Sequence, residues 1–472
     1  MLFRTREENQ NSLSEKRIVI IISVIGSFLT PFIGSSINIT LPAIGKDFGV
    51  STAMLGWIAT SFLLSSSITL LPAGRLADIY GRKIFYTIGM FIFSLSSLLC
   101  SFAPDSASLI VFRVIQGVGG SMIFGTGVAL LSSVFSPGER GKALGINVSA
   151  VYLGGSLGPF VGGIITKNFG WRSVFIINAI IGGFVVFLIL WKLKKEWGGI
   201  KGEKFDFSGS IIYAVSIISI VLGLTSIKSY SGDLLLASGL AGIILFILHE
   251  KGRKFPLFSV ELIFRNRIFA FSNLAALINY SATFGVGFLM SLYLQQVKGL
   301  NPQEAGIVMV SQPVVMALVS PVAGNLSDRL EPRLIASTGM GVTSLGLFMF
   351  SFLNKESSIL YIIIAQIILG LGLGMFSSPN TNAVMGSVGK NVYSVASAIL
   401  ATMRIWGQML SMVIVTAFFS SPAVKIKIST INIENFIHNM RLAFVIFTLM
   451  CFAGIFASIA RGNASRAEEL GH

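Results

Sequence analysis

The sequence predicts an all-α, polytopic membrane protein with fourteen transmembrane helices, and three observations lead to that prediction. The 472 residues are 53% hydrophobic and 12% charged, whereas a soluble protein carries about 25% charged residues. Fourteen apolar runs reach the length of about 20 residues that crosses a bilayer. The Lys and Arg residues that give the net charge of +15 lie in short clusters between those runs, which indicates membrane orientation rather than nucleic-acid binding.

The apolar runs divide into a first set of six, a central pair and a second set of six. Each run is bounded by polar connecting segments, and the two runs of the central pair are separated only by a short polar stretch. We expect spans at residues 18–42, 53–73, 84–103, 107–134, 143–166 and 173–193, then 208–228 and 231–250, then 268–292, 303–324, 334–354, 358–379, 391–420 and 440–460.

The distribution of basic residues predicts the orientation. With the amino terminus in the cytoplasm, twenty-four of the 35 Lys and Arg residues lie on the cytoplasmic side and nine lie outside. Such an excess is typical of cytoplasmic loops. We therefore expect a multi-pass protein of the cell membrane with both termini in the cytoplasm.

An internal repeat supports two six-helix bundles. The Ala-Gly-x-Leu-x-Asp pattern that ends at Asp78 recurs at Asp328, after the second span of each set. Parallel repeats of this kind are typical of transporters, whose substrate site lies between the repeats. We expect a cytoplasmic tail at 1–16, a bundle at 17–198, a two-helix insertion at 199–256, a second bundle at 257–462 and a tail at 463–472.

Two arginines fall inside spans, Arg113 in the fourth and Arg404 in the thirteenth. Charge within a bilayer is costly and suggests a role in substrate binding or proton coupling. The alternative is an arginine that ties helices together through backbone carbonyls or extends to an interface. No Asp or Glu falls deep in a span, although a proton-driven carrier usually needs a carboxylate that titrates.

Two glycine-containing motifs predict places where helices move or touch. Gly74, Asp78, Gly81 and Arg82 lie between the second and third spans, where glycines permit a tight turn and an acid can cap a helix. We expect this cluster, and Asp328 in the repeat, to form in one conformational state and break in another. Gly158, Pro159 and Gly162 in the fifth span predict close packing together with a bend.

Other polar or aromatic residues within the spans either join helices or line a substrate cavity. These candidates are Asn38, Trp57, Gln116, Asn279, Tyr280, Gln312 and Asn380. The three histidines are scattered and predict no metal site, and no phosphate-binding G-x-x-x-x-G-K-[ST] motif occurs. We therefore expect no cofactor, no nucleic-acid partner and no enzymatic activity.

These motifs resemble those of the major facilitator superfamily, in particular its fourteen-helix drug:proton antiporters. The resemblance covers nearly the whole chain and rests on the segment 74–83, on Arg113 with Gln116, and on the fifth-helix residues 154–163. It implies a major facilitator fold, alternating access, and export of amphipathic compounds against inward proton flow. It also implies that Arg113 takes part in proton exchange and that Asp78 is a state-dependent latch.

The sequence departs from this family at two positions. Ile33 stands where the first helix usually carries an Asp, and Ala179 replaces a usual proline after Asn178. The first departure favours neutral or anionic substrates over cations. We expect a monomeric exporter of amphipathic drugs or metabolites that exchanges them for protons. The alternatives are an importer or uncoupled facilitator of a neutral or anionic solute, and a membrane enzyme or receptor built on a similar bundle.

Overall fold

A computed structural model describes residues 2–135, 137–197, 203–226, 229–251, 253, 256–257, 260–327, 329–389, 393–419 and 433–462. Fourteen helices within these residues are long and apolar enough to cross a membrane, and each overlaps one predicted span. No strand occurs in the described part of the chain. The predicted fold class is therefore confirmed.

The amino-terminal half packs as a bundle in which sequence neighbours are not always spatial neighbours. Here α1 packs against α5, α4 lies between α2 and α3, and α6 lies against α3. The six helices are α1 (Leu2–Phe48), α2 (Thr52–Tyr80), α3 (Arg82–Ser101), α4 (Ser106–Val134), α5 (Pro137–Phe169) and α6 (Arg172–Lys192).

The carboxyl-terminal half repeats the same packing. Helix α10 packs against α15, α14 lies between α12 and α13, and α16 lies against α13. The elements are α9 (Val260–Arg265), α10 (Arg267–Leu292), its π-helical extension η1 (Tyr293–Val297), α11 (Pro302–Met309), α12 (Ser311–Ser327), α13 (Pro332–Phe350), α14 (Ile359–Gly386), α15 (Tyr393–Phe419) and α16 (Ile433–Ala460). The pairs α10–η1 and α11–α12 each form one span.

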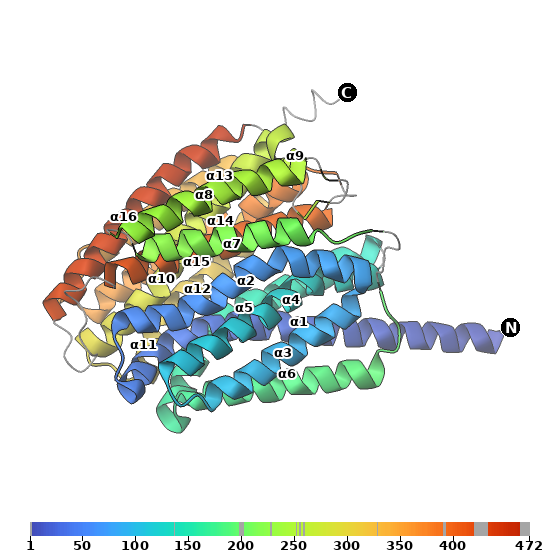
Figure 1. The fold of residues 1–472 in the computed structure, drawn as a ribbon, viewed down its shortest axis with the longest axis horizontal. Coiled ribbons are helices and arrows are strands. Elements are labelled where there is room, and N and C mark those ends of the chain that lie inside the picture. Colours follow the sequence, from blue (N-terminus) through green and yellow to red (C-terminus); the bar gives the residue numbers. More distant parts are fainter. Residues whose placement is uncertain are drawn as a thin grey trace.

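The two additional helices, α7 (Phe207–Thr225) and α8 (Tyr230–Lys251), pack against each other beside the two bundles (Figure 1). Helix α7 contacts α2 of one bundle and α15 of the other. The Tyr213 hydroxyl donates to the backbone oxygen of Ser67 on α2 at 2.6 Å and accepts from Trp406 Nε1 on α15 at 2.8 Å. Tyr213 is fully buried. Through this one side chain α7 is hydrogen-bonded to both bundles.

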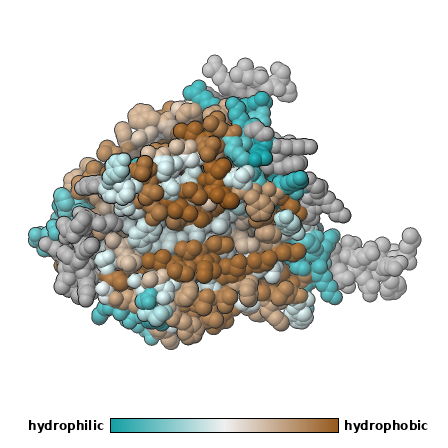
Figure 2. Space-filling model, viewed as in Figure 1, coloured by the Kyte–Doolittle hydropathy of each residue, from teal (hydrophilic) through white to brown (hydrophobic). Residues whose placement is uncertain are grey.

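The surface is divided as a membrane protein requires. A hydrophobic zone crosses the middle of the molecule, and hydrophilic residues gather at its two ends (Figure 2). Helix α1 begins and α16 ends at the same end (Figure 1), which the charge distribution identifies as cytoplasmic. The opposite, outer end carries the turns after α1, α3 and α5. The predicted domain limits near residues 198 and 257 stay a prediction.

Five helices differ by six residues or more from the predicted boundaries. The first helix spans Leu2–Phe48 rather than 18–42 and so takes in the predicted tail at 1–16 from residue 2 onward, and the fifth begins at Pro137 rather than 143. The second helix continues to Tyr80 rather than ending near residue 73, the twelfth span continues to Gly386, and the last begins at Ile433 rather than near 440. In each case polar residues extend the helix beyond its apolar part, because helices project from the hydrocarbon layer. The connection between the second and third spans is therefore Gly81 alone, and Gly74 and Asp78 lie in helix α2.

Candidate functional site

Helix α5 presents glycines on the side that faces α1. A Cβ at Gly162 would lie 2.8 Å from Ser36 Cβ, and Cβ atoms at Gly154 and Gly158 would overlap atoms of Phe28 and Ser35. The close packing predicted for this motif is present, since backbones approach most closely where side chains are absent.

A second side of α5 touches the other bundle. A Cβ at Gly163 would overlap the carbonyl oxygen of Pro302 on α11, and a Cβ at Gly306 on α11 would overlap the carbonyl oxygen of Pro159. A glycine of each helix thus packs against a proline carbonyl of the other helix. This reciprocal contact lies near the outer end of α5, and Pro159 belongs to it directly.

Further contacts join the bundles near the outer end. Lys167 Nζ donates to Gln303 Oε1 at 2.9 Å, and Gln295 Nε2 donates to the backbone oxygen of Ile39 at 3.0 Å. A Cβ at Gly56, near the outer start of α2, would lie 2.5 Å from the Thr416 hydroxyl of α15. The bundles are therefore in contact along three helix pairs on the outer side.

At the cytoplasmic end, Arg82 joins three helices of the first bundle. Its Nε and one terminal nitrogen bond Asp78 Oδ1 at 2.9 and 2.8 Å, and the other terminal nitrogen reaches the Ser133 hydroxyl at 2.5 Å and the Ala129 oxygen at 3.2 Å on α4. Asp78 on α2 is therefore held by Arg82 at the junction with α3 and α4 in this structure, and its role as a state-dependent latch stays a prediction. A Cβ at Gly74 would meet no described atom within 4 Å, whereas the Gly74 Cα lies 3.7 Å from the position of a Cβ at Gly125 on α4. The side of Gly74 that a side chain would occupy is therefore open in the described structure. The second copy, Asp328, lies outside the described residues.

Gly81 permits the abrupt turn between α2 and α3. Its φ of +127° is a conformation that other residues rarely adopt. A Cβ there would also lie 2.8 Å from the carboxyl carbon of Glu196. Glu196, which the sequence did not single out, accepts from the backbone N–H groups of Lys83 at 2.8 Å and Ile84 at 3.2 Å and so caps α3.

Arg113 lies in the interior of the amino-terminal bundle and is 1% exposed. Its Nε donates to the Ile58 oxygen at 3.3 Å, and a terminal nitrogen donates to Gln116 Oε1 at 2.6 Å. The guanidinium also lies 4.5 Å from the centre of the Phe62 ring. Gln116 in turn donates to the Ser97 hydroxyl at 2.6 Å. In this state the pair joins α2, α3 and α4.

Arg404 has a different environment, because it is half-buried and lies beside the boundary between the bundles. One terminal nitrogen donates to the Thr381 hydroxyl at 2.8 Å, and the guanidinium carbon lies 5.7 Å from the centre of the Tyr280 ring. Tyr152 on α5, which the sequence did not single out, reaches across to α14 and shares a hydrogen bond of 2.7 Å with Ser377.

The other predicted cavity residues fall into two groups. Trp57 and Gln312 are half-buried, whereas Asn38 and Asn279 are 6% and 0% exposed. Asn38 Nδ2 would lie 3.0 Å from a Cβ at Gly287 on α10, so Asn38 belongs to the contact between the bundles. Both amide atoms of Asn279 lack a hydrogen-bond partner in the described structure.

Asn380 joins helices of the carboxyl-terminal bundle through Arg461, a buried arginine that the sequence places among the cytoplasmic charges. Asn380 Nδ2 donates to the Ser272 oxygen at 3.1 Å and its Oδ1 accepts from Arg461 at 3.1 Å. Arg461 is 1% exposed and also donates to the Ser272 and Ser458 hydroxyls at 3.2 and 2.9 Å. Arg461 directly follows an apolar span, and this position in the sequence does not indicate that its side chain points into the bundle.

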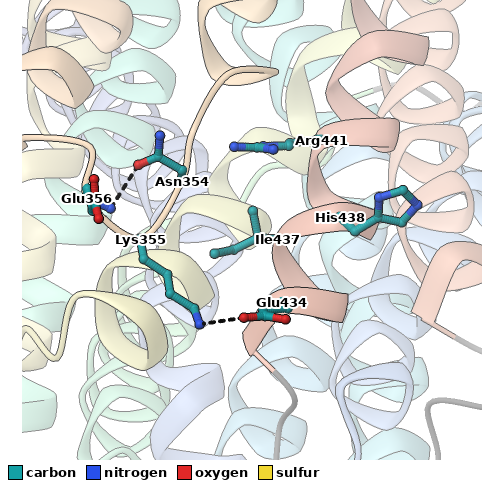
Figure 3. Close-up of a pocket in the computed structure, with 7 residues that line it drawn as sticks. All are labelled: Asn354, Lys355, Glu356, Glu434, Ile437, His438 and Arg441. Atoms are coloured by element: carbon teal, nitrogen blue, oxygen red, sulfur yellow. Dashed lines mark hydrogen bonds and ion pairs between the residues drawn. The ribbon is translucent and has the colours of Figure 1, made fainter.

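A shallow pocket opens at the outer end of the carboxyl-terminal bundle (Figure 3). The loop between α13 and α14 and the start of α16 line it, and Lys355 Nζ pairs with Glu434 Oε1 at 3.2 Å across it. Both of these side chains are at least half exposed. The pocket lies apart from the contact between the bundles, and its lining residues are Asn354, Lys355, Glu356, Glu434, Ile437, His438 and Arg441.

The cytoplasmic ends of α7 and α8 meet in a polar cluster. Asp206, His249 and Glu250 bring one ligand atom each to within 4.8 Å of one another, a set that could hold a metal ion. His249 Nε2 bonds Asp206 Oδ2 at 2.9 Å, and Arg253 lies 3.1 Å from the same nitrogen. A guanidinium in that position opposes a second cation, so we describe the cluster as an ion-pair network between the two helices.

Comparison with known proteins places this arrangement in a family. A family model described as Major Facilitator Superfamily matches residues 23–300 and 272–469. The chain is 36% identical to the riboflavin transporter RibZ of Clostridioides difficile over 87% of this chain and 88% of that protein. It is 30% identical to the multidrug transporter protein MdtP of Bacillus subtilis, over 82% and 72% of the two chains. It is 29% identical to the multidrug resistance protein Stp of Mycobacterium tuberculosis, over 83% and 73%.

Solved structures share the fold at low sequence identity. A bacterial homologue of the human lysosomal transporter Spinster, in an inward-facing and unoccupied conformation, superposes with a TM-score of 0.68 at 15% identity and covers 94% of this chain and 97% of its own. A D-xylose–proton symporter gives a TM-score of 0.67 at 13% identity, over 93% and 96%. All of these relatives and structural neighbours are transporters, which agrees with the absence of an enzymatic function expected from the sequence.

Proposed function

The chain belongs to the major facilitator superfamily of membrane transporters, and from this premise we propose that it carries flat, neutral or anionic aromatic solutes across the cell membrane, with riboflavin as the lead compound. The observation that carries the proposal is the charge within the spans. Arg404 lies within a span and is partly exposed, Arg113 adds a second positive charge in the interior of the amino-terminal bundle, and no Asp or Glu lies deep in any span. A site of that charge opposes cations and accepts electron-rich groups.

The contacts between the bundles support alternating access as the mechanism. The outer side is joined through α5–α11, α2–α15 and α1–α10, and the glycines at the α5–α11 contact allow these helices to meet and separate without interlocking side chains. Transport requires these contacts to open while a cytoplasmic contact forms. Arg82 with Asp78 is our candidate for a contact that differs between the two states.

The relatives support the substrate class. RibZ is a riboflavin transporter that matches this chain along nearly the full length of both proteins. The flavin ring is flat and uncharged at neutral pH, and it carries carbonyl acceptors along one edge. These properties fit a partly aromatic site with arginine donors, since arginine stacks on rings and donates to paired acceptors.

A counterflow assay tests the proposal independently of direction and coupling. Proteoliposomes of the full chain are loaded with unlabelled riboflavin and diluted into a trace of labelled riboflavin. We expect labelled flavin to accumulate transiently inside, and we expect the Arg265→Gln variant to behave like the wild type, because Arg265 is exposed on α9. Accumulation no greater than in protein-free liposomes would contradict the proposed substrate.

A second candidate function is the export of amphipathic drugs in exchange for protons. Relatives named as multidrug proteins and the fifth-helix glycines at the contact between the bundles favour it. The same proteoliposomes distinguish the two functions when a pH gradient is imposed. Accumulation of a cationic dye inside proteoliposomes with an acidic lumen would support drug:proton antiport, because the dye then enters as protons leave. Flavin counterflow that ignores the gradient would support the uncoupled carrier.

A further inference from the structure

The environment of Arg404 suggests where a solute is recognised. Arg404 on α15 and Thr381 on α14 are hydrogen-bonded, and Tyr280 on α10 places its ring beside the guanidinium. Tyr152 comes from the other bundle and bonds Ser377, one helical turn before Thr381. Arg404, Tyr280, Thr381 and Tyr152 are each half-buried. The guanidinium and the Tyr152 hydroxyl are therefore anchored on successive turns of α14.

The guanidinium of Arg404 retains donor capacity. Its Nε is inaccessible to solvent and has no acceptor in the described structure, and its assigned side-chain hydrogen bond is the one to Thr381. No ion pair to Arg404 occurs among the described residues. A guanidinium has five N–H donors in a planar fork, and a donor that stays unpaired away from water is costly. Arg404 is therefore suited to bind a further acceptor.

The other two arginines within the bundles have a different surrounding. Arg113 and Arg461 are each 1% exposed and bond groups of their own bundle. A solute between the bundles has no access to either side chain in this state. The Nε of Arg461 also lacks an acceptor in the described structure, so an unpaired donor alone does not single out Arg404. Arg404 differs from the other two because it is partly exposed and interacts with Tyr152 of the other bundle.

We propose that Arg404, with Tyr152 and Tyr280, forms a subsite that binds the acceptor edge of a flat, neutral or anionic heteroaromatic solute. The guanidinium donates to carbonyl or oxyanion groups on that edge, and the tyrosine rings flank the flat ring system. This inference rests on the proposed function and names the residues that set its selectivity. The hydrogen bond between the Tyr152 hydroxyl and Ser377 joins the two bundles. A solute that bonds Ser377 in place of Tyr152 would therefore break this contact.

Two dyes with the same ring skeleton and opposite charge test the subsite without assuming that flavin is the substrate. Binding of fluorescein, which is anionic, and rhodamine 123, which is cationic, is measured by fluorescence anisotropy on the purified full chain. We expect the wild type to prefer fluorescein. We expect Arg404→Gln to lower the ratio of the two affinities at least tenfold and Arg404→Lys to lower it less, because lysine keeps the charge and loses the fork.

The Arg265→Gln variant is the matched control, since it removes the same charge from an exposed position and should leave the ratio unchanged. Size-exclusion profiles establish that each variant is folded. An equal loss of both affinities in Arg404→Gln, an unchanged ratio, or a wild type that binds neither dye would overturn the subsite. A changed ratio without flavin counterflow would retain the subsite and reject riboflavin as the substrate.

Discussion

Arg113 places a guanidinium in the interior of the amino-terminal bundle, with a backbone carbonyl and a glutamine amide as its acceptors. The family resemblance implies a role in proton exchange, whereas its contacts in this state join helices. Arg113→Lys separates these interpretations. We expect it to lower the stability by about 1–3 kcal/mol, because the fork that serves Ile58 and Gln116 is lost, and to leave counterflow per folded molecule unchanged.

The measurement pairs a thermal unfolding curve in detergent with counterflow normalised to folded protein. A variant that unfolds like the wild type but no longer exchanges solute would assign Arg113 to transport and contradict the structural role. The sequence places both Arg113 and Arg404 within apolar spans and does not separate their roles. Arg113 is buried and Arg404 is partly exposed, so we assign Arg404 to the solute.

At the scale of elements, helix α5 determines how closely the bundles approach on the outer side. Gly163→Ala places a methyl group against the Pro302 carbonyl, which is backbone and moves only if α11 moves. We expect this variant to shift the population toward an outward-open state. Gly155→Ala is the matched control on the same helix, because a Cβ there meets nothing within 4 Å.

The reporter is a cysteine in place of Asn38, which is 6% exposed between α1 and α10. The native Cys100 and Cys451 are buried. Labelling of intact cells by a membrane-impermeant maleimide should be several-fold faster with Gly163→Ala than with Gly155→Ala. Equal rates in the two backgrounds would show that the glycine contact does not limit outer opening.

Asp206 stabilises the α7–α8 pair from outside the membrane. Its Oδ1 caps α7 by accepting from the Gly209 N–H at 2.9 Å, and its Oδ2 pairs with His249 on α8. Burial raises the pKa of Asp206, but the bonds from Gly209, Ser208 and His249 outweigh it, so the pKa lies below its ordinary value. The stabilisation is therefore complete above the ordinary carboxyl pKa and is lost as the pH falls through the lowered pKa.

Asp206→Asn removes the titrating group and keeps a side chain that can cap the helix. We expect a lower melting temperature than the wild type at pH 5–8, corresponding to about 1–2 kcal/mol, and a difference that shrinks below about pH 4. The measurement is a series of melting curves across this range in one detergent. A difference that is the same at pH 3 and pH 7 would contradict the role of the Asp206 charge.

Sequence patterns predict the elements of this protein better than their contacts. Apolar length alone locates all fourteen spans, because a helix in lipid must be continuous and hydrophobic. The pattern does not locate Tyr152, Glu196 or Arg461, since each acts on a residue far away in the sequence. The same limit explains why Arg113 and Arg404 look alike in the sequence, although one lies within a bundle and the other lies at the boundary between bundles.

For the whole molecule, the α7–α8 pair is more than an addition to the lipid-facing surface. Tyr213 bonds α2 of one bundle and α15 of the other through a single hydroxyl, and its ring stacks on Trp406 with centroids 5.9 Å apart. Movement of the bundles relative to each other must break one of these bonds or carry α7 with it. We predict that Tyr213 stabilises the outer-closed state relative to the outer-open one.

Tyr213→Phe tests this, because it keeps the ring and removes both hydrogen bonds. Tyr361→Phe is the matched control, since the Tyr361 hydroxyl donates to Met349 within one bundle at 2.7 Å. Both variants should lose about 1–2 kcal/mol of stability, but only Tyr213→Phe should speed maleimide labelling of a cysteine at position 38. If the two variants label at the same rate, α7 follows one bundle passively and its bond to the other does not set the conformational equilibrium.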